Sequence, residues 1–211
     1  MTHYDFTNLP VGRYVDALKA QRLEDDFDRV SATITAIYGL TPDDIDNLQL
    51  SEYADYVRAI RFLAGDMPKH RVANRYRLDQ WQLVPMTDIG RWTTAQYIDF
   101  QDMAKAMPDM LVTMLSTLLV PSGHKYNDGY DMDALHRDIG NEMAVAEAVA
   151  LLDFFLRRSV TTISRMLDSF GTDRTKREEM SKALQTLSRL GGGGWLMWME
   201  SLRPSESRGA L

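Results

Sequence analysis

The sequence predicts a mainly α-helical protein: one multi-helix domain with a small β-hairpin insert near residues 71–86. Apolar residues recur at steps of three and four through most of the chain, which is the period of an amphipathic helix. Helix start and stop signals separate these stretches. Strict alternation of apolar and polar residues is found in one short segment only. With 211 residues, of which 45% are hydrophobic, the chain is long enough to bury a substantial core.

The N-terminal part predicts two helices in succession. Pro10 stands at a plausible helix start, and the segment up to Gln21 carries apolar residues at helical spacing. The next helix runs from about Asp25 to Tyr38 and ends at Gly39, which suits a left-handed cap. Its predicted apolar face consists of Phe27, Val30, Ile34 and Ile37.

A strong helix start follows at residues 41–44, Thr-Pro-Asp-Asp. Thr41 can cap the helix, proline is preset for the first helical position, and acidic side chains favour the positive end of the helix dipole. This short helix is predicted to end near Leu48. Ser51 then opens a further helix, which runs from Tyr53 to Leu63.

The period changes to two between Arg71 and Met86. Residues 75–78 and 81–84 alternate in polarity, and Asp79 and Gln80 stand between them as the turn. We therefore predict a β-hairpin here. Helices resume at Thr93, where the sequence Thr-Thr-Ala-Gln matches a capping box that ends at Gln96.

Residues 120–123, Val-Pro-Ser-Gly, are predicted to end a helix, and the following polar loop contains the turn signal Asn-Asp-Gly at residues 127–129. The longest helix is expected from about Met143 to Phe170. Its apolar residues form a seam that faces either the core or a partner. The seam includes Val145, Val149, Leu152, Leu156, Val160, Ile163, Leu167 and Phe170.

The C-terminal region divides from the rest at a run of four glycines. We expect residues 1–190 to form the helical domain, and residues 191–211 to form a glycine-rich hinge, an aromatic arm and a disordered tail. The arm contains five large apolar residues in succession, whose exposure to water is unfavourable: Trp195, Leu196, Met197, Trp198 and Met199. We therefore expect the arm to dock on its own body or on another chain. The residues predicted to bind a partner are Trp195, Leu196, Trp198 and Met199 of the arm, with Leu152, Leu156 and Ile163 of the seam. A seam of this length is compatible with a homo-oligomer.

Composition excludes several classes of function. A net charge of −6 gives no general attraction to phosphate, so we expect no nucleic-acid partner. The N-terminus lacks the features of a signal peptide, and the longest apolar stretch is too short to span a bilayer, so no membrane association is expected. The absence of cysteine excludes disulfides and thiolate chemistry.

Charge is unevenly distributed along the chain. Residues 1–66 carry 6 basic and 12 acidic side chains, whereas residues 157–211 carry 10 basic and 6 acidic side chains. Such asymmetry either orients a subunit against a partner or reflects ordinary solvated helix faces.

No motif predicts catalysis or metal binding, and we expect neither an enzyme nor a cofactor. The polar cluster from His124 to His136, which includes Asp128, Asp131 and Asp133, fits no EF-hand or zinc spacing. A turn followed by a helix start near Met132 is the preferred interpretation of this cluster, and an enzyme using it would need those side chains to converge on a cleft.

Several segments together resemble small phage or prophage proteins encoded among tail genes. They include Trp-Gln-Leu-Val-Pro at residues 81–85, Thr-Thr-Ala-Gln-Tyr-Ile-Asp-Phe-Gln at residues 93–101, and Leu-Leu-Val-Pro-Ser-Gly-His-Lys-Tyr-Asn at residues 118–127. With Leu-Pro-Val-Gly-Arg-Tyr at residues 9–14 and Leu-Ser-Glu-Tyr at residues 50–53, the resemblance covers about Leu9 to Phe170.

Such proteins are similar to phage tail-assembly chaperones or to baseplate-hub assembly factors. The resemblance implies a non-enzymatic protein of the host cytoplasm that binds hydrophobic or helical segments of a tail protein, such as the tape-measure protein or a tube or hub component. The alternative is a structural virion subunit of the baseplate or connector region. The resemblance carries over no catalytic residue, and it does not extend to the glycine-rich arm.

Overall fold

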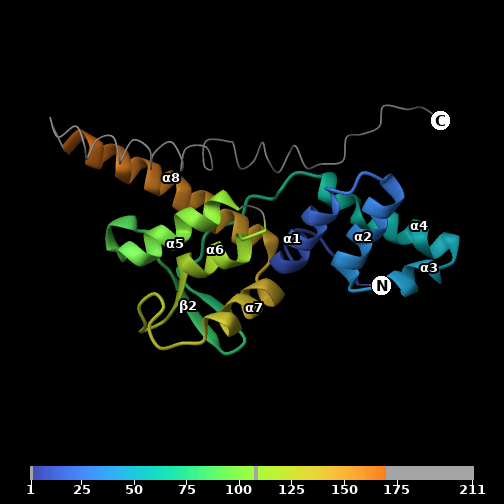
Figure 1. Ribbon diagram of the computed structural model, residues 1–211, viewed down its shortest axis with the longest axis horizontal. Helices are drawn as coiled ribbons and strands as arrows, with labels where there is room; N and C mark the ends of the chain where they lie inside the picture. The colour runs from blue at the N-terminus through green and yellow to red at the C-terminus, as the bar shows by residue number, and fades with distance from the viewer. Residues whose placement is uncertain (1, 107–108, 170–211) are drawn as a thin grey trace.

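The computed structural model describes residues 2–106 and 109–169 (Figure 1). These residues form a mainly helical fold with one small antiparallel sheet, which confirms the predicted fold class. The α-helices are α1 (Val11–Ala20), α2 (Asp26–Tyr38), α3 (Pro42–Asp46), α4 (Leu50–Ala59), α5 (Thr94–Lys105), α6 (Leu111–Leu118), α7 (Met132–Glu142) and α8 (Val145–Ser169). The 3₁₀ helices are η1 (Ile60–Ala64) and η2 (Ile89–Arg91), and the strands are β1 (Tyr76–Leu78), β2 (Trp81–Pro85) and β3 (Leu119–Pro121). Residues 191–211 lie outside the described part of the chain, so the predicted boundary near residue 190 stays a prediction.

Helix α1 occupies the middle of the molecule. In Figure 1, α2, α3 and α4 lie on one side of it, and the sheet with α5 to α8 lies on the other. The start of α1 is tied to the start of α8 by backbone hydrogen bonds: Val11 N donates to Met143 O at 2.8 Å, and Val145 N donates to Leu9 O at 2.9 Å. One continuous core therefore runs from α1 into α6, α7 and α8.

Helices α1 and α7 cross at a pair of glycines. A Cβ atom placed on Gly12 would lie 2.8 Å from the carbonyl oxygen of Gly140, well inside van der Waals contact. Only glycine at position 12 lets the two backbones approach this closely.

The helix signals near the N-terminus act as predicted. Gly39 has φ +69° and ends α2 in the left-handed conformation. Thr41 accepts a hydrogen bond from Asp44 N at 3.1 Å while the Asp44 carboxylate accepts one from Thr41 N at 2.7 Å, which completes a capping box at the start of α3. Helix α4 begins at Leu50, one residue before the predicted start at Ser51. Gln49 and Glu52 form a capping box there.

The predicted β-hairpin is present, and it gains a third strand. Strands β1 and β2 pair antiparallel around Asp79 and Gln80, with Leu78 opposite Trp81. Strand β3, whose Val120 pairs with Val84, was not predicted. The sequence pattern at residues 120–123 indicates the end of a helix instead. A strand of three residues is stabilised by its partner more than by its own sequence, so local patterns did not reveal it.

The hairpin is fastened to α7 by two carboxylates. Asp79 N donates to Glu142 at 2.7 Å, and the Trp81 indole Nε1 donates to Asp138 at 2.7 Å. These bonds hold the β1–β2 turn against the helix.

Only half of the predicted capping box at Thr93 forms. Thr93 accepts a hydrogen bond from Gln96 N at 3.1 Å, as predicted. The Gln96 side chain does not return to Thr93; it is buried and donates to the backbone oxygen of Thr117 at 2.6 Å. This hydrogen bond is favoured over one to Thr93 N, because leaving the buried Thr117 carbonyl without a donor would cost about 1–3 kcal/mol.

Candidate functional site

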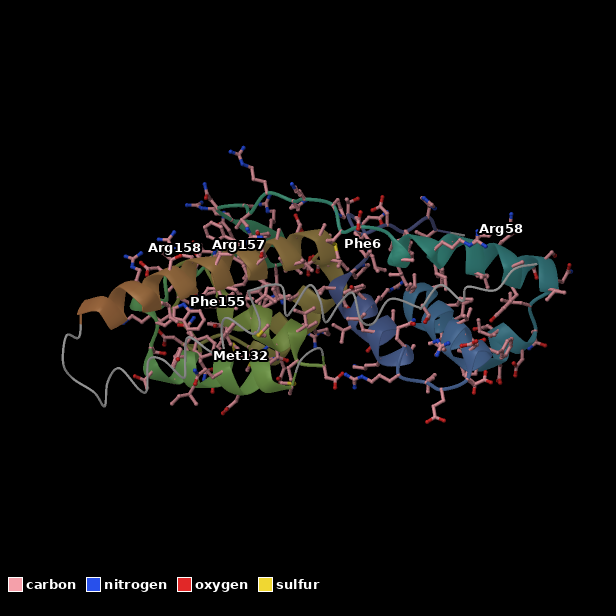
Figure 2. All side chains as sticks on the ribbon, turned by 90° about the horizontal axis from the view of Figure 1, so that it is seen from above. Phe6, Arg58, Met132, Phe155, Arg157 and Arg158 are labelled. Carbon is pink, nitrogen blue, oxygen red and sulfur yellow. The ribbon has the colours of Figure 1, made fainter. Side chains whose placement is uncertain are left out.

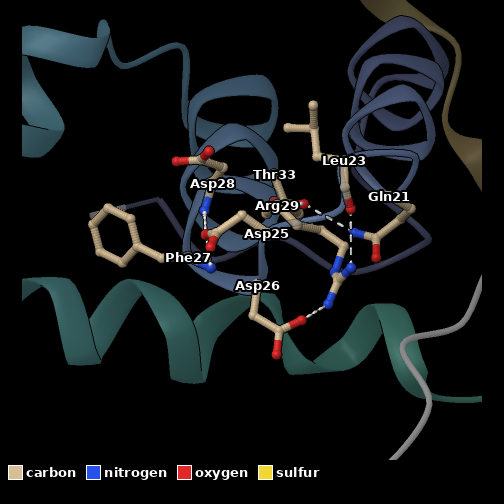
Figure 3. A network of polar contacts seen from close by, with 8 residues as sticks. All are labelled: Gln21, Leu23, Asp25, Asp26, Phe27, Asp28, Arg29 and Thr33. Carbon is tan, nitrogen blue, oxygen red and sulfur yellow. Dashed lines mark hydrogen bonds and ion pairs between the residues drawn. The ribbon is translucent and has the colours of Figure 1, made fainter.

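The N-terminus of α2 is organised by acidic side chains (Figure 3). The Asp25 carboxylate caps the helix by accepting hydrogen bonds from Phe27 N at 2.8 Å and Asp28 N at 2.9 Å. Arg29 pairs with Asp26 and donates to Leu23 O at 3.0 Å. Figure 3 shows the Phe27 ring pointing away from Arg29. The first turn of α2 is therefore fixed, and it presents an aromatic ring at the surface.

Phe27 does not lie on the buried face that the sequence predicted. Its side chain is 59% exposed, whereas Ile34 and Ile37 of the same helix are fully buried. The reason is positional: Phe27 belongs to the first turn of α2, where its neighbour is Tyr53 of α4. The two rings stack with centroids 5.5 Å apart and an interplanar angle of 26°. The Tyr53 hydroxyl lies 3.1 Å from Ser31 Oγ, which holds the tyrosine against α2.

Helix α4 is amphipathic but only partly covered. None of its residues, Leu50–Ala59, is buried. Its apolar side chains on one side rest on α2, for example Tyr56 against Tyr38 with ring centroids 4.9 Å apart. Leu50, at the start of the helix, is 85% exposed. Leu50 of α4 and Phe27 of α2 therefore expose apolar side chains on two helices that contact each other.

The segment that carries Phe27 and Leu50 is rich in carboxylates. Residues 24–66, which include α2, α3 and α4, carry 10 acidic and 3 basic side chains. Two of the three arginines are already engaged, Arg29 by Asp26 and Arg58 by Asp55. We call the surface formed by Phe27, Leu50 and Tyr53 together with the carboxylates Glu24, Asp28, Asp43 and Asp46 the aromatic acidic face. Chemically it offers exposed apolar and aromatic side chains together with exposed carboxylates from the same three helices and the segment before α2, which suits the binding of a complementary surface.

Two of the predicted partner-binding residues on α8, Leu152 and Leu156, lie inside the protein. Leu152 and Leu156 are 0% and 1% exposed and belong to the core. Phe155 of the same helix, labelled in Figure 2, stacks on Trp92, which directly follows η2, with ring centroids 4.8 Å apart. Of the two orientations open for the seam, the structure therefore gives the core-facing one at Leu152 and Leu156. On the same helix Arg157 and Arg158 are exposed.

The remaining predicted partner-binding residues are not placed by the structure. Trp195, Leu196, Trp198 and Met199 lie outside the described residues, and the side chain of Ile163 does too. Their proposed role stays a prediction.

The polar cluster from His124 to His136 is organised as a turn and a helix start. Asp131 caps α7 by accepting a hydrogen bond from Ala134 N at 2.9 Å, as the preferred interpretation predicted. His124 Nδ1 lies 3.0 Å from the backbone oxygen of Asp128. Within residues 2–106 and 109–169 there is no group of three or more His, Asp or Glu side chains that could hold a metal ion.

Burial shifts the pKa of several titratable groups in and near this loop, among them His136 and Tyr126. Burial lowers the pKa of His136, although the nearby Asp133 raises it, and His136 Nε2 is buried without a hydrogen-bond partner in the described structure. Burial raises the pKa of Tyr126, as does the hydrogen bond of 2.9 Å that its hydroxyl donates to Asp99. Tyr126 therefore stays a neutral donor that ties the loop to α5.

The sequence signal for the aromatic acidic face was its charge. The sequence shows the excess of acidic residues in the first 66 positions, but its helical periodicity predicts a buried Phe27 and indicates no role for Leu50. An aromatic residue among three aspartates, as at residues 25–28, is the sequence signal that would have indicated an exposed ring.

Comparison with known proteins adds no relative. No protein-family model matches the chain, and no curated protein or solved structure is significantly similar to it. In the part of the chain that the structure describes, no helix combines the length and apolar character needed to cross a membrane.

Proposed function

We propose that this chain is a non-enzymatic assembly chaperone of the phage-tail type, and that its aromatic acidic face binds a hydrophobic helical segment of a tail protein. The client would be a tape-measure protein or a tube or hub component, as the resemblance of residues 9–170 implies. One observation carries the proposal: Phe27 and Leu50, 59% and 85% exposed, lie on two adjacent helices, one of which has no buried residue along Leu50–Ala59.

The mechanism is that of helix recognition by a complementary surface. A client helix that packs along α4 removes Leu50 and Phe27 from water, and full burial of one such side chain contributes about 1.5–3 kcal/mol. The client buries its own apolar stripe at the same time. That stripe is then shielded until tail subunits polymerise around the client.

Rigid support favours this surface over a loop. Phe27 is held by the cap at Asp25 and by the Tyr53 ring, and Tyr53 is held by Ser31. Little conformational entropy is lost at these side chains when a client binds, because they are already ordered. The proposal places the protein in the host cytoplasm, where tail assembly takes place, and it requires no cofactor.

Co-purification tests the proposal. The tagged full-length chain is expressed with the neighbouring tail genes, and bound proteins are identified by mass spectrometry. We expect recovery of a long helical tail protein with the wild-type chain and its loss with the double variant Phe27→Ser, Leu50→Ser. Ile98→Ser is the matched control, because Ile98 is an exposed apolar residue, 50% exposed, that lies on α5.

Two results would count against the proposal. Recovery of the same tail protein by the double variant would remove the aromatic acidic face from the interaction. Stoichiometric presence of the chain in purified virions would make it a structural subunit of the baseplate or connector region instead.

A further inference from the structure

The net negative charge of the protein lies in the segment that carries the aromatic acidic face. Residues 24–66 carry 10 acidic and 3 basic side chains, a net charge of −7, whereas the whole chain carries −6. The rest of the molecule is therefore nearly neutral. A one-signed field of this kind attracts positively charged partners and repels phosphate-rich and acidic ones.

Several of these carboxylates are available to a partner. Asp26 and Asp55 are paired with Arg29 and Arg58. In contrast, Glu24, Asp28, Asp43 and Asp46 have no cationic partner within the described part of the chain, and all four are exposed. These four side chains belong to α2, α3 and the segment before α2, so they lie on the same side of α1 as Phe27 and Leu50 (Figure 1).

The shape of the apolar centre indicates a helical occupant. Phe27 and Tyr53 form one stacked pair across the α2–α4 contact, and Leu50 lies one helical turn before Tyr53 on α4. The three residues thus follow one turn of α4 and its contact with α2. A linear set of apolar side chains is complementary to the single stripe that an amphipathic helix presents at positions i, i+3 and i+7.

From these observations we infer that the aromatic acidic face selects a positively charged amphipathic helix of a partner protein, with lysine or arginine on both sides of its apolar stripe. This inference rests on the proposed function and specifies the chemistry of the client. The apolar stripe covers Phe27, Leu50 and Tyr53, and the basic side chains reach the four unpaired carboxylates.

The aromatic arm of this chain is a poorer match for the face. Between Gly191 and Arg203 the charged side chains are Glu200 and Arg203, so this segment has no net charge. An arm without net positive charge gains less from acidic side chains than a lysine- or arginine-rich helix does, so the charge distribution favours a partner helix over the arm.

Two synthetic peptides test the selection directly. Both are amphipathic, about 15 to 20 residues long so that they can form helices, and have the same leucine stripe. One has lysine on its polar face and the other has glutamate. Binding to the full-length protein is measured by fluorescence anisotropy at low and high salt. We expect at least about tenfold tighter binding of the lysine peptide, and a preference that weakens as salt screens the charges.

Variants place the binding on the face. The double variant Glu24→Gln, Asp46→Asn removes two unpaired carboxylates that lie outside the first turns of α2 and α3, so neither helix loses a dipole partner. We expect the affinity for the lysine peptide to fall by about two- to fivefold per carboxylate. Asp128→Asn, Asp133→Asn is the matched control on the loop before α7 and on α7 itself, and it should leave binding unchanged.

The outcomes separate this inference from the proposed function. Equal or tighter binding of the glutamate peptide overturns the charge selection, whereas client co-purification by the wild-type chain would still stand. Lysine-peptide binding that neither Leu50→Ser nor the carboxylate variant weakens moves the interaction elsewhere and overturns the inference. Binding that appears only after Trp195→Ser and Trp198→Ser are introduced into the full chain would assign the face to the arm, which also overturns it. The inference is also overturned if the lysine peptide binds neither the wild-type protein nor the Trp195→Ser, Trp198→Ser variant.

Discussion

Substitution of Gly12 by alanine tests the close crossing of α1 and α7. A Cβ atom at this position meets three backbone atoms of Gly140: the oxygen at 2.8 Å, the carbonyl carbon at 3.2 Å and Cα at 3.3 Å. Ordinary contact begins at about 3.4 Å, so the helices must separate by about 0.6 Å. No side chain can rotate to relieve the contact, because all three atoms belong to the backbone.

The expected cost follows from this geometry. Inserting a methyl group into a packed contact costs about 1–3 kcal/mol. The usual gain in helix propensity from glycine to alanine, about 1 kcal/mol in a helix interior, is reduced here because Gly12 lies in the first turn of α1. We therefore expect Gly12→Ala to lower the free energy of unfolding by about 1–2 kcal/mol, which corresponds to a fall in Tm of about 2–8 °C for a domain of this size.

Gly140→Ala provides the matched control on the opposite helix. A Cβ atom at Gly140 meets only a Val112 methyl group at 3.7 Å, Gly12 Cα at 3.9 Å and a second Val112 methyl group at 3.9 Å, which are ordinary contacts. Gly140 lies in the last turn of α7, so part of the gain in helix propensity remains, and we expect an unchanged or slightly higher stability, by less than about 1 kcal/mol. Urea unfolding followed by circular dichroism measures both variants. If Gly12→Ala is as stable as the wild type, or if Gly140→Ala is the more damaging change, the crossing is not as close as described.

Three further predictions concern stability. Gln96→Ala leaves the Thr117 carbonyl without its donor and should lower the free energy of unfolding by about 1–3 kcal/mol in urea titrations. Gly39→Ala places a Cβ atom at φ +69° and should cost about 1–2 kcal/mol by the same assay, because L-residues are disfavoured in the left-handed region. His136 is neutral in the folded protein because burial lowers its pKa, so the free energy of unfolding should decrease as pH falls below about 6.5, its pKa in the unfolded chain. Urea titrations at about pH 7.5 and about pH 5.5 should show a smaller decrease for His136→Gln.

Each of these predictions has a control. Gln101→Ala removes a hydrogen bond to the part-buried Tyr97 hydroxyl and should cost less than Gln96→Ala; an equal cost would contradict the role given to the buried Thr117 carbonyl. Gly39→Asn should be milder than Gly39→Ala, since asparagine tolerates the left-handed region. An unaltered pH dependence of the free energy of unfolding in His136→Gln would show that other groups cause its decrease at low pH.

The sequence alone determined the helices and the hairpin wherever the deciding interaction is local. The cap of α3 joins Thr41 to Asp44, and the end of α2 is set by Gly39 itself. The turn of the β1–β2 hairpin was placed correctly at Asp79 and Gln80 by the change of period on either side. These interactions span a few residues, so the sequence pattern contains both partners.

Only the tertiary structure decided how the apolar residues are shared between core and surface. Helical periodicity placed Phe27 with Ile34, and it left the seam of Leu152 open to either the core or a partner. The structure exposes Phe27 and buries Ile34 and Leu152. The physical reason is that burial depends on which helices pack together across long separations in the chain, such as α8 against the start of α1. For the same reason the strand at Val120 was found only when its partner Val84 was in place.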